Sequence, residues 1–246
     1  MVHNKNNLEL EIILVLLKNK AHLREIARNL NKPHSTILRK INELLKEKIL
    51  DYKKEGKNKV FFIKNNLKAK NYVYSAEIHK LNNLLRKNPE LSIIFEDIKK
   101  NFSKGMIILF GSFAKGIPKK DSDIDIYLET NDNSIKTRVK EINSKLSIKI
   151  GKFDTKSLLI KEIIKEHIII RGLEDYYERV EVFKELDRQK DELISMVSHQ
   201  LAAPVTAMKW YIEMLLDGEM GKVTDDQKEH LTSMQKVGAD LNDLVS

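Results

Sequence analysis

The sequence predicts a multidomain α+β protein with three unlike units, and three observations lead to this fold class. Apolar residues recur at helical spacing through residues 8–45, and two short apolar segments around Gly56 add a hairpin of strands. A compact apolar run at 106–110 precedes alternating acidic and apolar residues, which indicates strands of a small mixed sheet. From about residue 174 the apolar spacing is helical again, over two helices joined by a glycine-containing loop.

Net charge divides the chain at the same place. Residues 174–246 carry 16 acidic and 8 basic side chains, whereas residues 1–173 carry 36 basic and 20 acidic ones. This change of sign indicates a fusion of two parts, either natural or an engineered chimera; a basic enzyme with an acidic helical tail is the alternative. We expect unit boundaries that give residues 1–68, a helical connector at 69–104, a mixed-sheet core at 105–173 and a helical hairpin at 174–246.

Composition excludes several classes of protein. The 246 residues contain no cysteine, which excludes a disulfide scaffold, a zinc site with thiolate ligands and a cysteine nucleophile. The sequence shows neither a signal-peptide pattern nor an apolar run long enough for a bilayer, so we expect a cytoplasmic protein without a membrane partner. The net charge of +8 favours a polyanionic partner.

The first unit has three helical segments over residues 8–46, followed by two strand segments around a loop at 53–59. This order resembles the winged helix-turn-helix family, in which the second helix of the motif enters the major groove of DNA. In that reading the lysines contact phosphates and Arg39 is the candidate for a base edge. A solvated basic surface on a protein-interaction module is the alternative. The expected DNA contacts are Ser35, Thr36, Arg39, Lys40, Lys53, Lys57 and Lys59.

The middle unit contains the most specific motif of the chain. Gly111 and Ser112 follow the apolar run, and ten residues separate Ser112 from Asp123. Side chains on a strand alternate between its faces, so Asp123 and Asp125 share one face. Two neighbouring carboxylates repel each other, and Mg²⁺ relieves this repulsion because it binds a few carboxylates together with substrate phosphates. The glycine-serine turn can donate hydrogen bonds to phosphates. These residues therefore predict a metal and phosphate site.

This arrangement resembles the signature of minimal nucleotidyltransferases of the DNA polymerase β superfamily. The resemblance implies transfer of a nucleotide, often AMP from ATP, to a protein or small-molecule acceptor, which in some members is a partner toxin. It implies up to two Mg²⁺ ions and ATP or another NTP as the substrate. The family has a third carboxylate on a following strand; here that strand shows Ser147 and Lys149, so Asp154 beyond it is the candidate. The implied nucleotide-binding residues are Gly111, Ser112, Lys115 and Gly116, and the implied catalytic metal ligands are Asp123, Asp125 and Asp154.

The last unit reads as a helical hairpin with an exposed apolar stripe. Two such hairpins can form a four-helix bundle, so we expect a homodimer through residues 174–246. The segment from Ser198 to Pro204 resembles the phosphoacceptor motif of the dimerisation domain of sensor histidine kinases, which implies His199 as phosphoacceptor. Ala202 and Ala203 replace the Arg-Thr that is usual there. The sequence shows no ATP-binding kinase domain, so we expect no autonomous histidine kinase activity.

Three functional hypotheses follow, and we prefer the first. It is a Mg²⁺-dependent nucleotidyltransferase with a DNA-binding winged helix and a dimerising hairpin. The second is a non-catalytic DNA-binding regulator or antitoxin whose nucleotidyltransferase fold only binds a nucleotide or a partner. The third is a truncated histidine kinase signalling chimera.

Overall fold

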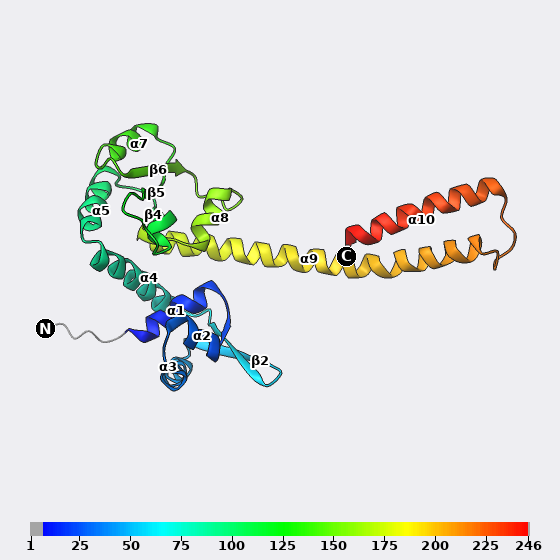
Figure 1. Cartoon of the computed structure of the whole chain (residues 1–246), viewed down its shortest axis with the longest axis horizontal. Coiled ribbons are helices and arrows are strands. Elements are labelled where there is room, and N and C mark those ends of the chain that lie inside the picture. The colour runs from blue at the N-terminus through cyan, green and yellow to red at the C-terminus, as the bar shows by residue number, and fades with distance from the viewer. Residues whose placement is uncertain (1–6, 246) are drawn as a thin grey trace. The chain divides into compact units, whose positions relative to one another are not determined.

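The structure is a computed structural model that describes the backbone of residues 7–245 and the side chains of residues 7–237. Residues 1–6 and 246, at the ends of the first and last expected units, lie outside this description. The chain divides into two compact units between Val180 and Glu181. Helices and two separate sheets confirm the multidomain α+β class (Figure 1). None of the described helices is long and apolar enough to cross a membrane.

The first part of the chain has the winged-helix order of elements. Helices α1, α2 and α3 bury a common apolar core in which Ile12, Ile26 and Ile41 are fully enclosed. Asn31, with a φ of 49°, ends α2 in the left-handed region that asparagine tolerates. The short strand β1 was not expected, because two residues show no periodicity. The elements are α1 (Leu8–Lys18), β1 (Ala21–His22), α2 (Leu23–Leu30), α3 (His34–Lys46), β2 (Leu50–Glu55) and β3 (Asn58–Ile63), with the strands in the antiparallel order β1-β3-β2.

The wing is tighter than the sequence indicated. The ladder between β2 and β3 continues to the pair formed by Glu55 and Asn58, so only Gly56 and Lys57 form the turn. Gly56 has a φ of 59°, and a glycine in the left-handed region allows strands to pair up to a two-residue turn. The expected loop at 53–59 is therefore mostly strand.

Two helices follow, α4 (Leu67–Lys87) and α5 (Glu90–Asn101), and they have different packing partners. The N-cap Asn66 of α4 accepts a hydrogen bond from the backbone of Ala69 at 2.9 Å, and α4 then packs along α1. The apolar face of α5 instead belongs to the core of the second sheet, where Leu91 and Ile98 are buried. Half of the expected connector at 69–104 is thus part of the sheet domain.

The second sheet has four strands in the order β6-β5-β4-β7. Strand β4 pairs antiparallel with β5 and β7, whereas β5 and β6 are parallel, so the small mixed sheet is confirmed. A crossover through a helix joins the parallel pair, as parallel neighbours require. The elements are β4 (Ile107–Phe110), α6 (Gly111–Ala114), β5 (Ile124–Glu129), α7 (Asn133–Lys140), β6 (Leu146–Gly151), α8 (Leu158–Lys165) and β7 (Ile168–Arg171).

Both faces of this sheet are covered. Ile124, Ile126 and Leu128 face a core shared with α5, as the alternation predicted. Tyr127, on the opposite face, is buried with Phe153, and its hydroxyl donates a hydrogen bond to a backbone carbonyl. This face of β5 is therefore closed at Tyr127, whereas Asp125 and Glu129 near the two ends of the strand remain partly exposed.

Helix α9 (Leu173–Leu216) starts inside the first unit. Tyr176 and Val180 are buried in the core on the Tyr127 side of the sheet. The unit boundary therefore lies after the first two turns of α9, some six residues beyond the position at which the charge changes sign.

The second unit consists of the remainder of α9 and α10 (Asp225–Val245), which folds back along it (Figure 1). Val205 and Ile212 of α9 are buried within this hairpin. Thr224 and Gln227 form a capping box at the start of α10, because the backbone N–H of each donates to the side chain of the other at 2.9 and 3.3 Å. These reciprocal bonds fix the start of α10.

Candidate functional site

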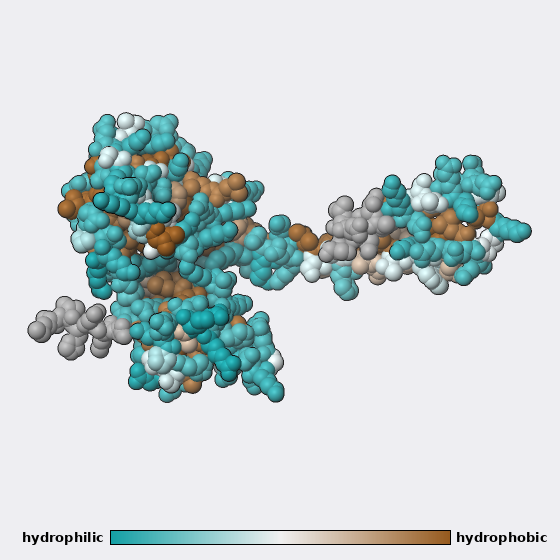
Figure 2. Space-filling model, in the orientation of Figure 1, coloured by the Kyte–Doolittle hydropathy of each residue, from teal (hydrophilic) through white to brown (hydrophobic). Residues whose placement is uncertain are grey.

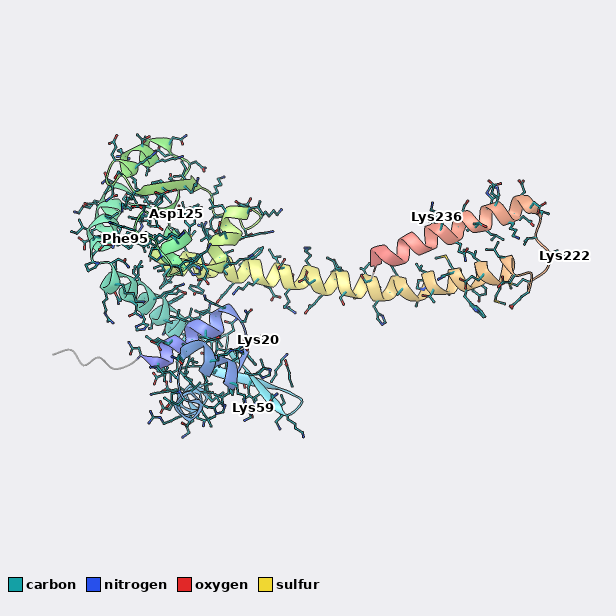
Figure 3. The ribbon with its side chains drawn as sticks, in the orientation of Figure 1. Lys20, Lys59, Phe95, Asp125, Lys222 and Lys236 are labelled. Carbon is teal, nitrogen blue, oxygen red and sulfur yellow. The ribbon has the colours of Figure 1, made fainter. Side chains whose placement is uncertain are left out.

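The glycine-serine turn and the acidic strand meet because of the strand register. Phe110, the last residue of β4, is paired with Asp125 of β5, and α6 begins at the next residue. Asp125 is labelled in Figure 3. Gly111 has a φ of 71°, and a Cβ built on it would lie 2.2 Å from the Asp125 carboxylate oxygen Oδ2. Any side chain at this position would collide with that carboxylate. The glycine is therefore required by Asp125 itself, a reason that the sequence motif does not reveal.

The carboxylates of Asp123 and Asp125, here called the acidic pair, concentrate negative charge at the start of β5. Asp123 is exposed in the preceding loop, and Asp125 is half-buried. Burial is the largest cause that raises the pKa of Asp125 above its ordinary value, and the charges of Asp123 and Glu162 add to it. A hydrogen bond from Ser147 and the charge of Lys149 act in the opposite direction. Two carboxylates in a partly dehydrated, negative environment are a donor set that suits a divalent cation.

Asp154 does not join this pair. In the parallel ladder Asp125 lies opposite Ser147, and β6 continues for four more residues to Gly151 before the chain leaves the sheet. The end of β6 is therefore about 13 Å along the strand from Asp125, at roughly 3.3 Å per residue. Asp154 instead closes a turn there, where it accepts a hydrogen bond from the backbone of Lys156 at 3.0 Å. Residues 7–237 contain no group of three His, Asp or Glu side chains placed to hold a metal ion.

Lys115 has a partner that the sequence did not indicate. This lysine follows α6 directly, and its Nζ lies 3.3 Å from the Oε1 of Glu162 on α8. Gly116, with a φ of 74°, then turns the chain away, and Ser112 is half-buried within α6. The four expected nucleotide-binding residues thus lie together in and directly after α6, which contacts β5, and Glu162 lies beside Lys115. No sequence signal points to Glu162, because it is one of many acids on an amphipathic helix.

A groove of about 780 Å³ separates the wing from α2 and the start of α3. The expected contacts Lys57 and Lys59 line it, together with His34, Arg24 and Arg28, and no pattern in the sequence had pointed to the two arginines. Lys59 also lies over the Tyr52 ring at 4.0 Å, a cation–π contact that holds it on the wing (Figure 3). Ser35 and Arg39 are exposed on α3, and Thr36 is half-exposed.

Lys40 differs from the other expected DNA contacts. Its ammonium lies 2.7 Å from Glu9 and 2.6 Å from Glu43, and these hydrogen bonds raise the pKa of Lys40. Two carboxylates therefore compensate its charge, and only 23% of its side chain is exposed. Because Glu9 belongs to α1, the spacing of residues on α3 gives no indication of this pairing.

His199 is exposed on α9, in the second unit. Its surroundings on the helix include Ala203, Thr206 and Trp210. The helix continues through Pro204, which lacks the backbone N–H of an ordinary helical residue. Thr206 donates a hydrogen bond to the carbonyl of Ala202 at 2.8 Å.

Two family models match successive parts of the chain and overlap at residues 189–197. The model of the nucleotidyltransferase domain family matches residues 91–197, and the model of the His kinase A (phospho-acceptor) domain family matches residues 189–246. The chain therefore carries a nucleotidyltransferase domain followed by a histidine kinase phosphoacceptor domain. The first match begins on α5, in agreement with the packing of that helix against the sheet.

Two solved structures each match about a third of the chain. A protein of Archaeoglobus fulgidus, AF1382, is 21% identical with a TM-score of 0.28, over 32% of this chain and 91% of that chain. The adhesin competence repressor AdcR of Streptococcus pyogenes is 21% identical with a TM-score of 0.29, over 38% of this chain and 76% of that chain. No curated protein matches the chain.

Proposed function

We propose that the chain is a divalent-metal-dependent nucleotidyltransferase, which transfers a nucleotide, with AMP from ATP as the first candidate, to a protein or small-molecule acceptor. The observation that supports this most is the contact between Gly111 and Asp125. It supports a site in which the expected phosphate-binding turn lies beside Asp125. The match to the nucleotidyltransferase family over residues 91–197 agrees with a transferase of this general kind.

In this reaction an acceptor oxygen forms a bond to the α-phosphorus, the bond to the bridging oxygen of the β-phosphate breaks, and pyrophosphate leaves. Asp123 and Asp125 would hold the metal, which when bound supplies positive charge at the phosphates. Ser147 orients the Asp125 carboxylate by its hydrogen bond. Lys115 provides a cation beside the turn. The role of the chain is thus to position two carboxylates, a turn and an ammonium around one triphosphate.

Incubation with α-labelled ATP and Mg²⁺ tests this function, with candidate proteins and small molecules as acceptors. We expect label on an acceptor, release of pyrophosphate, and loss of both when EDTA is added. Failure to label any acceptor with any of the four ribonucleoside triphosphates would contradict catalysis.

The same geometry favours one alternative, a regulator or antitoxin whose nucleotidyltransferase fold only binds a nucleotide or a partner. The observation in its favour is that Ser147 and Lys149, not an acid, face Asp125 from β6. Binding of ATP without turnover in the same experiment would support this alternative.

We propose further that the winged helix binds DNA in the groove between its wing and α2. Two lysines, two arginines and two histidines line this groove, whereas Glu25 is its one acidic residue. Such an excess of positive charge suits a phosphate backbone, whose contacts provide affinity without reading sequence.

Replacing Lys57 with Met should weaken DNA binding and lower the slope of log affinity against log salt by about 1, because one phosphate contact is lost. Lys40→Met should leave this slope unchanged, since Glu9 and Glu43 already compensate Lys40. Salt titrations of a fluorescent duplex measure both slopes. Equal slopes for the wild type and Lys57→Met would contradict the groove assignment.

We also propose that the hairpin forms a homodimer. Leu193, Val197 and Leu201 of α9 are 55%, 43% and 40% exposed, and apolar side chains are visible along the hairpin (Figure 2). Pairing of two hairpins into a four-helix bundle would remove such side chains from water. The match to the phosphoacceptor domain family is consistent with dimerisation.

Leu201→Glu should convert the dimer to a monomer, because a buried unpaired carboxylate is costly. Ser195→Glu, at an exposed position on the other side of α9, should leave the dimer intact. Light scattering coupled to size-exclusion chromatography reads out the mass. A wild-type mass equal to that of one chain at micromolar concentration would refute the dimer.

A further inference from the structure

The ion pair between Lys115 and Glu162 joins two elements that are distant in sequence. Lys115 ends the short helix of the phosphate-binding turn, and Glu162 lies in the middle of α8. Their atoms Nζ and Oε1 are 3.3 Å apart, and the side chains remain 43% and 53% exposed. Exposed ion pairs of this kind contribute little to stability and are readily exchanged for another partner.

Glu162 also has an electrostatic influence on Asp125. Its negative charge is among the causes that raise the pKa of Asp125, which places it within electrostatic range of that carboxylate. It is nevertheless not a third member of a metal-binding group among residues 7–237. In this structure the hydrogen-bond partner of Lys115 is Glu162.

A nucleoside triphosphate bound at this turn would compete with Glu162 for the ammonium of Lys115. Its β- and γ-phosphates carry more charge and more acceptor oxygens than a single carboxylate, so they compete well for an ammonium at the same turn. Until they arrive, Glu162 restricts the rotamers of a long and flexible side chain. After they arrive, the same carboxylate has lost its cation and is left to the solvent, to which 53% of its side chain is already exposed.

On the basis of the proposed function, we propose that Glu162 is a positioning residue that holds Lys115 in an exchangeable ion pair, which the β- and γ-phosphates of a nucleoside triphosphate displace. Glu162 thereby acts on triphosphate affinity through Lys115. The exchange selects for a polyphosphate, because a nucleoside monophosphate offers no β- or γ-phosphate to Lys115.

Three consequences separate this role from a structural one. Glu162→Gln removes the competing charge and should tighten binding of a non-hydrolysable ATP analogue about threefold to tenfold. Lys115→Met should weaken that binding about tenfold. In the Lys115→Met background the additional Glu162→Gln change should alter affinity less than twofold, because Glu162 then has no ammonium to release.

Calorimetric titration of the full chain with the analogue, with and without Mg²⁺, measures this double-mutant cycle, and it does not depend on turnover. AMP is the matched ligand, and its affinity should be the same in wild type and Glu162→Gln. Glu96→Gln, a change of the same kind at an exposed position on α5, is the control variant.

Four outcomes are decisive. Tighter analogue binding by Glu162→Gln that vanishes without Lys115 supports the exchange. An equal gain in both backgrounds, or a loss of affinity in Glu162→Gln, overturns it while leaving the nucleotidyltransferase proposal standing. If the wild type binds the analogue and neither variant changes the affinity, the exchange is likewise overturned and the nucleotidyltransferase proposal stands. Wild type that binds no triphosphate at all overturns both proposals.

Discussion

Asp125→Asn is expected to lower nucleotide transfer by at least about 10³-fold and, at the same time, to raise the melting temperature. The loss of transfer follows because one of two metal-binding carboxylates loses its charge, an effect of the size seen when a charge-stabilising group is removed from an active site. The gain in stability follows because burial, Asp123 and Glu162 all disfavour the charged form of Asp125. The isosteric amide keeps an oxygen to accept the hydrogen bond of Ser147.

The opposite signs of the two effects make this variant informative. A site that holds like charges together costs stability in the absence of its ligand, and removing one charge recovers it. Differential scanning calorimetry and the label-transfer assay on one preparation measure both effects. Asp154→Asn is the matched control, since Asp154 lies at the far end of β6 and should retain transfer. A variant Asp125→Asn that retains transfer, or that melts below the wild type, would contradict the assigned role.

The features that sequence could predict are those determined by neighbouring residues. The turn at Gly111 and the acidic pair were recognisable because their spacing is a property of two consecutive strands. The same holds for the helical faces of α1 to α3 and for the capping box at Thr224. In each of these cases periodicity or a short motif contains the whole signal.

The features that sequence could not predict depend on which elements become neighbours in space. Asp154 was assigned to the metal site because it is the first acidic residue that follows strand β6 in the chain. The parallel register places the start of β6 beside Asp125, so Asp154 follows the opposite end of that strand. Lys40 was assigned to DNA by its position on α3, but Glu9 of α1 compensates it. Glu162 was not considered because only tertiary packing brings α8 to Lys115.

A buried polar cluster leads to the second large expected effect. Glu77 of α4 is 3% exposed, and it accepts a hydrogen bond from Tyr177 of α9 at 2.9 Å. His167, which precedes β7, lies 3.6 Å from the same carboxylate and contacts Tyr176 at 3.1 Å. The ammonium of Lys80 lies 4.0 Å from the second carboxylate oxygen. One carboxylate thus joins the winged-helix side of the first unit to the sheet domain and to the start of α9.

Glu77→Ala should destabilise the first unit by about 3–5 kcal/mol, because it leaves the buried partners of a charge network without an acceptor. For a unit of this size that corresponds to a melting temperature lower by roughly 10 °C. Glu77→Gln should cost less, since the amide oxygen still accepts from Tyr177. Calorimetry of the full chain at pH 7 measures the melting temperatures, which should fall in the order wild type, Glu77→Gln, Glu77→Ala. Glu96→Gln, on the exposed face of α5, should melt as the wild type does.

The pH dependence of this difference gives a sharper test. Burial alone would raise the pKa of Glu77, but the nearby His167 ring, the charge of Lys80 and the hydrogen bond from Tyr177 outweigh it and hold the pKa below the ordinary value of 4.5. A depressed carboxyl pKa adds stability that is fully present above pH 4.5 and is lost as the pH falls through the lower folded value. The gap in melting temperature between wild type and Glu77→Gln should therefore be constant from pH 7 to 5 and shrink toward pH 3. A gap that widens on acidification would show that burial dominates and that Glu77 is held neutral in the folded protein.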